Sequence, residues 1–266
     1  MGLWYHVYPS AVETRFTHSL EVMMLAEKLL DTMGVRCHRV RKLVMVGALY
    51  HDVGHVALSH ALDHCIEALT GLDHEHRSCQ VVHEILHKEH GLLDEGESHI
   101  VQAIISGTVT KEAQKAMDED EEAKWEPWML QVVHHPDPNT PDVDRLAYIA
   151  SNGIFCGLIT MKPDFIISHA AKDTKTGNLM WRGCEEQIAM VQVVRAHMHR
   201  VCYQHPYVKR VEAAYLDAIR STRLLEQEAA KRDHKCWWMV VDDAWLYTQL
   251  YLLAPTQLKQ IETHTL

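Results

Sequence analysis

The segment from Tyr50 to Asp63 constrains the fold more than any other part of the chain. Between these two residues it contains several side chains of the types that bind metal ions, namely His51, Asp52, His55 and His60. Adjacent side chains on a helix point about 100° apart, so His51 and Asp52 can share one ion only if that ion lies beside the edge of the helix. Further ligands must then arrive from other parts of the chain, and the fold has to bring them there.

The periodic segments of the chain are almost all helical. Apolar spacing predicts helices over residues 17–33, 38–51, 57–69, 73–87, 187–204, 208–231, 244–253 and 255–263. We expect Thr140 to cap, and Pro141 to open, a further helix that carries Asp144. Residues 172–183 are polar and contain glycine, which favours a loop or a short hairpin. The expected fold is therefore all-α, with at most a short β-hairpin.

His18 and Asp144 are the best partners for the His51–Asp52 pair, because each would arrive on its own helix. Alone, a buried histidine is usually just hydrogen-bonded, and an aspartate near a helix start is usually a surface carboxylate. Together the four side chains would supply two imidazoles and two carboxylates, which suit manganese, iron, magnesium, zinc or nickel about equally. A six-coordinate ion would keep two positions for water and a phosphate oxygen, which is the arrangement that produces hydroxide near neutral pH.

Composition excludes several classes of protein. The net charge of −10 argues against a nucleic-acid-binding surface. The longest apolar run, residues 43–50, is far too short to span a bilayer, and the N-terminus does not resemble a signal peptide. The seven cysteines form no Cys-x-x-Cys pair, which favours a reducing compartment. We expect a cytoplasmic protein that does not contact membranes.

Several motifs resemble those of the HD-domain phosphohydrolase superfamily and, within it, the deoxynucleoside triphosphate (dNTP) triphosphohydrolases. The resemblance is strongest to the catalytic core of those that also carry a sterile alpha motif. The matching motifs are Arg15-Phe16-Thr17-His18, His51-Asp52-Val53-Gly54-His55, Leu58-Ser59-His60-Ala61-Leu62-Asp63, His74-Glu75 and Asp142-Val143-Asp144-Arg145. The resemblance implies one HD domain over residues 1–266, with a metal-binding core at about 15–152 and substrate-pocket and C-terminal helices at about 185–266.

The resemblance also implies a role for each matching residue. His18, His51, Asp52 and Asp144 match metal ligands for a divalent transition metal such as manganese or iron, and a second ion, magnesium, could enter with the substrate phosphates. The α-phosphate and the leaving group would be handled by His55, His60, Asp63 and His74. We favour His60 as the proton donor, with His74 as its rival, because expelling a nucleoside 5′-oxygen needs an acid. Contacts to the triphosphate and the sugar would come from Arg15, Arg145, Tyr148, Asn152, Arg195, His199 and Tyr203.

The implied reaction is attack of a metal-bound hydroxide on the α-phosphorus of a dNTP, which releases tripolyphosphate and a 2′-deoxynucleoside. Two positions depart from the family pattern: Asn152 stands where an aspartate is expected near the sugar 3′-hydroxyl, and Arg145 replaces a lysine. The alternatives are a nucleotidase or phosphodiesterase acting on mono- or cyclic nucleotides, and a non-catalytic nucleotide-binding assembly protein. The cations Arg15, Arg145 and Arg195 favour a triphosphate. We also expect a homo-oligomer without nucleotide-activated regulation.

Overall fold

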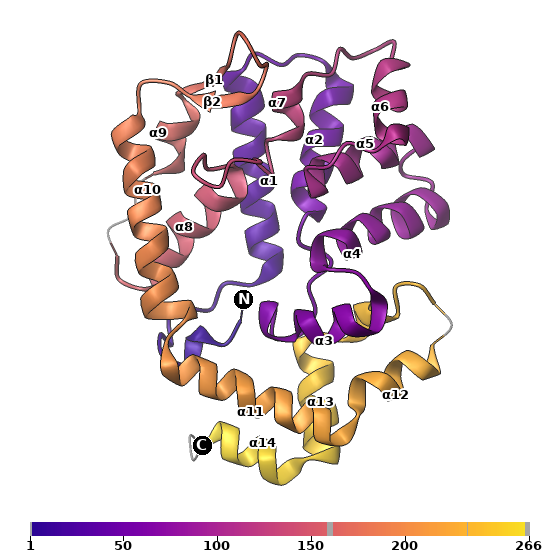
Figure 1. The fold of residues 1–266 in the computed structure, drawn as a ribbon, viewed down its shortest axis with the longest axis vertical. Helices are drawn as coiled ribbons and strands as arrows, with labels where there is room; N and C mark the ends of the chain where they lie inside the picture. The colour runs from indigo at the N-terminus through magenta and orange to yellow at the C-terminus, as the bar shows by residue number, and fades with distance from the viewer. Residues whose placement is uncertain (1, 159–161, 233, 264–266) are drawn as a thin grey trace.

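The computed structural model describes residues 2–158, 162–232 and 234–263. In these ranges the regular secondary structure is helical apart from one two-stranded sheet (Figure 1). The α-helices are α1 (Arg15–Thr32), α2 (His38–Tyr50), α3 (His60–Thr70), α4 (His74–Val81), α5 (Glu95–Ser106), α6 (Lys111–Asp118), α7 (Pro127–Leu130), α8 (Val143–Phe155), α9 (Pro163–Ile167), α10 (Glu185–Met198), α11 (Pro206–Thr222), α12 (Leu224–Lys231), α13 (Asp243–Leu253) and α14 (Pro255–Glu262). Short 3₁₀ turns lie at Trp4–His6 and Trp237–Val240, and π-helical turns at Val82–Glu89 and His199–Tyr203.

One hydrophobic core is built around α1, α2, α5 and α8. The helix α1 packs against both α2 and α8, and α2 packs against α5. A capping box at Thr14 and Thr17 starts α1, because each side chain accepts a hydrogen bond from the other residue's backbone N–H. Leu29, Leu43 and Ile104 are completely buried in this core. The packing fixes the N-terminal end of α1 near the C-terminal end of α2.

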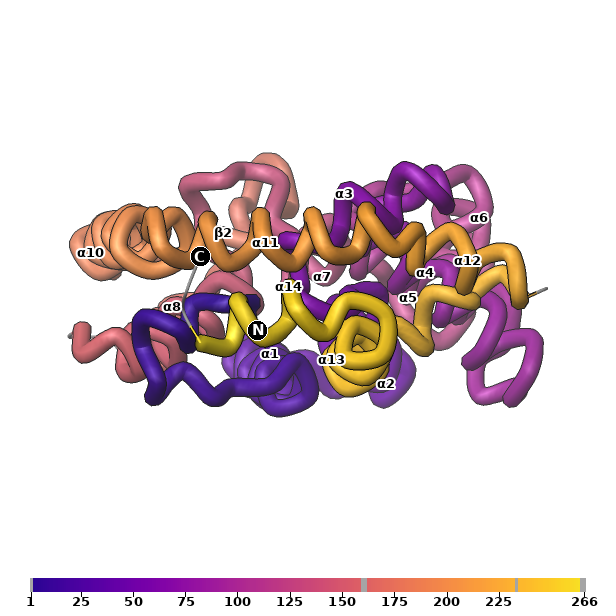
Figure 2. Tube along the Cα trace, turned by 90° about the horizontal axis from the view of Figure 1, so that it is seen from below, coloured from indigo at the N-terminus to yellow at the C-terminus, as the bar shows by residue number. Residues whose placement is uncertain are grey.

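A second core lies at the lower end of the molecule in Figure 1, where α11 runs across α13 and α14 and α12 continues from α11 (Figure 2). It also includes α3 and the N-terminal Trp4. Tyr50 and Tyr203 pack against both cores. Residues from the first and last thirds of the chain therefore meet at the boundary between the two cores.

The all-α prediction with a short hairpin is confirmed. The strands β1 (Ala170–Lys172) and β2 (Leu179–Trp181) pair antiparallel, with Ala171 opposite Met180.

Two local predictions were wrong. The helix that carries Asp144 begins at Val143, because Asp142 and not Thr140 is the N-cap, and its carboxylate accepts a hydrogen bond from the Arg145 N–H. The helix predicted over residues 208–231 breaks at Arg223, whose φ of 51° is left-handed and ends α11.

Within the described residues, no helix is both long enough and apolar enough to cross a membrane.

Candidate functional site

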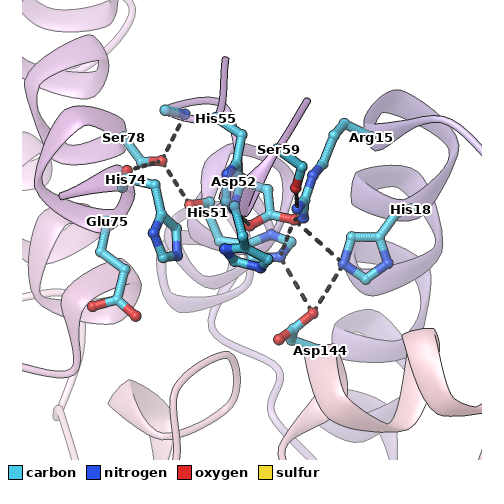
Figure 3. Close-up of polar contacts among 12 residues, drawn as sticks. Arg15, His18, His51, Asp52, His55, Ser59, His74, Glu75, Ser78 and Asp144 are labelled. Carbon is cyan, nitrogen blue, oxygen red and sulfur yellow. Dashed lines mark hydrogen bonds and ion pairs between the residues drawn. The ribbon is translucent and has the colours of Figure 1, made fainter. Parts of the chain in front are cut away.

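The four predicted metal ligands converge from three parts of the fold. His18 comes from α1, His51 and Asp52 follow the C-terminal end of α2, and Asp144 lies in the first turn of α8 (Figure 3). His18 Nε2 lies 2.9 Å from Asp144 Oδ1 and 3.5 Å from Asp52 Oδ2. His51 Nε2 lies 3.5 Å from the same two carboxylate oxygens. The ligand-type atoms of His18, His51 and Asp144 lie within 4.8 Å of one another, and Asp52 Oδ2 lies beside them at 3.5 Å from both imidazoles.

The geometry of His51 fits a bound ion. Its Nδ1 lies 2.8 Å from the Ala48 carbonyl oxygen and donates a hydrogen bond to it, so Nε2 is the atom that can bind either a second proton or a metal ion. This Nε2 is buried and has no hydrogen-bond partner among the described residues. Two ligand atoms that each lie about 2.1 Å from one ion are separated by roughly 3 to 3.5 Å. The separations around His51 match this value, so the residues fit a divalent metal.

The charges in this cluster also favour a cation. Burial lowers the pKa of His51, but the Asp52 and Asp144 carboxylates outweigh it and raise that pKa to about 9. Burial raises the pKa of Asp52, whereas Arg15 and His51 hold it well below its usual range. Two ionised carboxylates thus hold a proton on His51, and a divalent ion can replace that proton.

A second cluster surrounds Asp63. Three imidazoles turn their Nδ1 atoms toward Asp63 Oδ2, at 3.2 Å for His60, 3.4 Å for His55 and 3.5 Å for His74. The other carboxylate oxygen, Oδ1, accepts a hydrogen bond of 2.6 Å from Arg77 Nη2. Burial raises the pKa of Asp63, but the hydrogen bonds from His55 and His60 hold it well below its usual value. Asp63 is therefore an ionised carboxylate shared by three imidazoles.

Spacing alone would allow an ion in either cluster, and also in a third group formed by Glu13, His18 and Glu21. The Asp63 cluster has one carboxylate, already neutralised by Arg77, so a divalent ion there would face uncompensated repulsion. Burial raises the pKa of both Glu13 and Glu21, which makes them poorer anionic ligands. The cluster with two ionised aspartates is the best metal site of the three.

Both histidine–carboxylate clusters open on one cavity of about 430 Å³. Eleven of the predicted site residues line it, namely Arg15, His18, Asp52, His60, His74, Asp144, Tyr148, Asn152, Arg195, His199 and Tyr203. His51, His55 and Asp63 lie behind this wall and contact it through Asp52, Asp144, His60 and His74.

Two hydrogen bonds fix four of the side chains that line the cavity. Arg195 Nε donates to the Tyr148 hydroxyl at 2.8 Å, and Asn152 Nδ2 donates to the Tyr203 hydroxyl at 2.9 Å. His199 and Tyr203 belong to the π-helical turn that follows α10. Such turns are frequent at functional sites, because the wider turn re-aims side chains.

The structure does not bring Arg145 to the cavity wall. Its guanidinium instead donates to backbone carbonyls of the preceding loop, at 2.9 Å to Thr140 and 3.2 Å to Asp137. A different cation, Lys209, lines the cavity and pairs with Glu212 at 2.7 Å. Besides Arg15 and Arg195, the cavity is therefore lined by Lys209 in place of the predicted Arg145.

Sequence reasoning missed Ser59 and Arg77. Ser59 and Leu58 both have positive φ, at 53° and 59°, and this turn is held by Arg15, which donates to the Ser59 hydroxyl, and by Asp243, which accepts from the Leu58 N–H. Strain of this kind persists only where surrounding contacts enforce it. Arg77 lies one helical turn after His74, and that spacing was the only available sign that it faces the cluster.

A glycine explains how the two clusters come so close together. A Cβ on Gly54 would lie 2.1 Å from the His74 carbonyl oxygen and 2.6 Å from the Ser78 nitrogen. Only glycine allows the segment after Asp52 to pack against α4 at this distance.

Comparisons with known proteins find a family model and several relatives with similar sequences. The family model for the HD domain matches residues 15–132. The deoxynucleoside triphosphate triphosphohydrolase SAMHD1 homolog of Dictyostelium discoideum is 30% identical over 60% of this chain and 31% of its own length. A deoxyguanosinetriphosphate triphosphohydrolase-like protein of Rhodopseudomonas palustris is 37% identical over 28% of this chain and 19% of its own length. An HD domain-containing protein of Acanthamoeba polyphaga mimivirus is 24% identical over 82% of this chain and 49% of its own length.

The chain spans less than half the length of each of these relatives. Residues 15–132 match the HD domain model, and the chain resembles the HD-domain dNTP triphosphohydrolases.

Proposed function

We propose that this HD-domain chain hydrolyses deoxynucleoside triphosphates to a 2′-deoxynucleoside and tripolyphosphate in a metal-dependent reaction. One observation carries the proposal: a cluster suited to a cation and a cluster suited to a proton open on the same cavity, which Arg15 and Arg195 also line. The relatives named for dNTP and dGTP hydrolysis support the choice of substrate.

His18, His51, Asp52 and Asp144 would hold the ion. When bound there, a divalent metal would acidify a water molecule and withdraw charge from a phosphoryl oxygen. Arg15 assists from beside the site, because one of its Nη atoms donates to Asp52 and the other to the Ser59 hydroxyl. It thereby keeps Asp52 ionised and aimed at the ion.

His60 would protonate the leaving 5′-oxygen. Its side chain is 70% exposed to the cavity and solvent, whereas that of His74 is 26% exposed. If Nδ1 of His60 donates to Asp63, its Nε2 is the atom that faces the substrate. To donate from Nε2 while Nδ1 donates to Asp63, the imidazole must carry hydrogens on both nitrogens, and a histidine in this form is a common general acid.

Arg195, His199 and Lys209 would contact the phosphate chain. They reach the cavity from α10, the π-helical turn and α11. A guanidinium suits phosphate oxygens because its planar fork can donate two parallel hydrogen bonds.

Asn152 would bind a hydroxyl of the sugar. The Asn152 side chain is almost fully buried, and its Oδ1 has no hydrogen-bond partner among the described residues because Nδ2 is the atom that contacts Tyr203. A buried acceptor without a donor is costly, and the 3′-hydroxyl of a deoxyribose would satisfy it. Tyr203, fixed by the same hydrogen bond, would crowd a 2′-hydroxyl and so disfavour ribonucleotides.

Product analysis tests the proposal. The purified protein is incubated with manganese or with magnesium, and with each of the four dNTPs or ATP, and the products are resolved by ion-exchange chromatography. Tripolyphosphate and a deoxynucleoside are the expected products, with little turnover of ATP. Monophosphate plus pyrophosphate would place the attack at a different bond. Turnover of mono- or cyclic nucleotides alone would favour the phosphodiesterase alternative, and no turnover with any metal would favour the non-catalytic one.

A further inference from the structure

Arg77 is a fully buried cation that the proposed reaction does not yet use. It lies on α4 and is 0% exposed. Its guanidinium donates from Nε to the Gly54 carbonyl at 2.8 Å, from Nη1 to the Leu72 carbonyl at 2.8 Å and from Nη2 to Asp63 Oδ1 at 2.6 Å. Each guanidinium nitrogen therefore has a fixed acceptor, and the group has a single orientation.

Trp238 closes the other face of this guanidinium. Its ring centroid lies 5.7 Å from Arg77 Cζ, within the range of a cation–π contact. Trp238 is 1% exposed and belongs to the second core, whereas the HD family match ends at residue 132. The C-terminal part of the chain thus reaches the histidine cluster through Trp238 and Arg77.

Stability alone does not explain this pair. Taking an arginine and a carboxylate out of water costs about as much as their attraction returns, so apolar residues of the same volume would serve a core equally well. The pair instead fixes the orientation of the Asp63 carboxylate. With Oδ1 held by Arg77, the only free oxygen of Asp63 is Oδ2, and the Nδ1 atoms of His55, His60 and His74 all lie within 3.5 Å of it.

We propose that Arg77 is a positioning residue that fixes Asp63, so that the Nδ1 atoms of His60 and His74 are held on the carboxylate and their Nε2 atoms face the substrate. This inference rests on the proposed function only for its effect on turnover. The orientation of the imidazoles can be measured whether or not the protein turns over a dNTP.

The first test is a double-mutant cycle of Arg77→Met and Asp63→Asn. Each single change is expected to lower kcat by about 10- to 100-fold, part of the contribution of a general acid, while KM stays nearly constant. If Arg77 acts through Asp63, adding Arg77→Met to Asp63→Asn changes kcat by no more than about twofold. Losses that multiply across the two positions would overturn the proposal.

The cycle also distinguishes an effect on turnover from an effect of misfolding. Arg77→Met leaves the Asp63 charge buried and unpaired, whereas the double variant removes both charges and keeps the volume. Arg39→Met is the control, because Arg39 also pairs with carboxylates, at 2.9 Å to Glu97 and 3.2 Å to Asp120, but does not line the cavity. It is expected to lower stability and leave kcat unchanged.

The second test reads the imidazoles directly by long-range ¹H–¹⁵N NMR of the histidine rings. In the wild-type protein, His60 is expected to carry its proton on Nδ1, and in Arg77→Met to become a mixture of the two tautomers. Arg39→Met should reproduce the wild-type spectrum. An unchanged His60 tautomer in Arg77→Met would refute the positioning role. Wild-type protein that shows the expected tautomer but releases no tripolyphosphate would instead refute the proposed function.

Discussion

His51 and His55 lie four residues apart and are both buried, yet their surroundings shift their pKa values in opposite directions. Burial lowers the pKa of each. At His51 the Asp52 and Asp144 carboxylates reverse the effect and raise it to about 9, whereas at His55 Arg15 adds to it and the pKa falls to about 3. Each imidazole faces two carboxylates, because His55 lies 3.5 Å from Asp52 Oδ1 and 3.4 Å from Asp63 Oδ2. The neighbouring Arg15 cation, and not the number of carboxylates, therefore separates the two histidines. On this basis we propose that the His51 cluster holds the ion and that the Asp63 cluster handles a proton.

Replacing a residue of the His51 cluster should have the largest effect on activity. A metal supplies several kcal/mol of transition-state stabilisation, so His51→Ala or Asp52→Ala is expected to lower kcat/KM by about 10³-fold or more. Steady-state release of tripolyphosphate measures this loss. His64→Ala, an exposed position on α3, serves as the control. A His51→Ala protein that keeps most of its activity would show that the reaction does not depend on this cluster.

Replacing a histidine of the Asp63 cluster should lower kcat by less, and only with substrates whose leaving group needs a proton. His60→Gln is expected to lower kcat by about 10²-fold, and His74→Gln by less, because a positioned acid contributes about 10² to 10⁴. A dNTP analogue with a bridging 5′-sulfur leaves as a thiolate and needs no proton. The His60→Gln defect should largely vanish with that analogue. If it persists, His60 acts in binding rather than as the acid.

Arg195 lines the cavity and Arg145 does not, so replacing each of them extends the comparison. Arg195→Met removes a cation that lines the cavity and is expected to raise KM about tenfold, the value of one charge-assisted hydrogen bond. Arg145→Met removes bonds to loop carbonyls and is expected to lower stability by about 1 to 2 kcal/mol with kcat/KM nearly unchanged. Urea unfolding and steady-state kinetics separate the two effects. A large rise in KM for Arg145→Met would place that side chain in the substrate site after all.

The smallest effect concerns the pH dependence of stability. The pKa of His55 is lower in the folded protein than in the unfolded chain, so the unfolded chain binds more protons below about pH 6.5 and stability falls as the pH falls. Between pH 7 and pH 5 this group should cost the metal-free protein about 1 to 2 kcal/mol. Urea unfolding at both pH values should show a shallower dependence in His55→Asn than in the wild type. Equal slopes would mean that the pKa of His55 is the same in the folded and unfolded states.

Much of the site follows from the sequence, because the spacing of histidines and aspartates on helices constrains where they can point. The helical periods bring His18, His51 and Asp144 together, as expected, once α1, α2 and α8 share a core. Helix ends are harder to predict, since Asp142 and Thr140 are both good N-caps and only the loop from residue 135 selects one.

Side chains whose partners are backbone carbonyls leave no pattern in the sequence. Arg145 and Arg77 are both arginines near a motif, yet one binds a surface loop and the other a buried carboxylate. The difference arises from the path of the loop at residues 135–140 and from the packing of Trp238, neither of which has a sequence signature. The homo-oligomeric state and the cytoplasmic compartment stay predictions from the sequence.

The most direct test of the division between the two clusters is an anomalous difference map from a crystal soaked in manganese. We expect one peak at about 2.2 Å from His51 Nε2 and from a carboxylate oxygen of both Asp52 and Asp144. A peak among His55, His60 and His74 would contradict the assignment, because it would show that an ion occupies the cluster whose only carboxylate is already paired with Arg77.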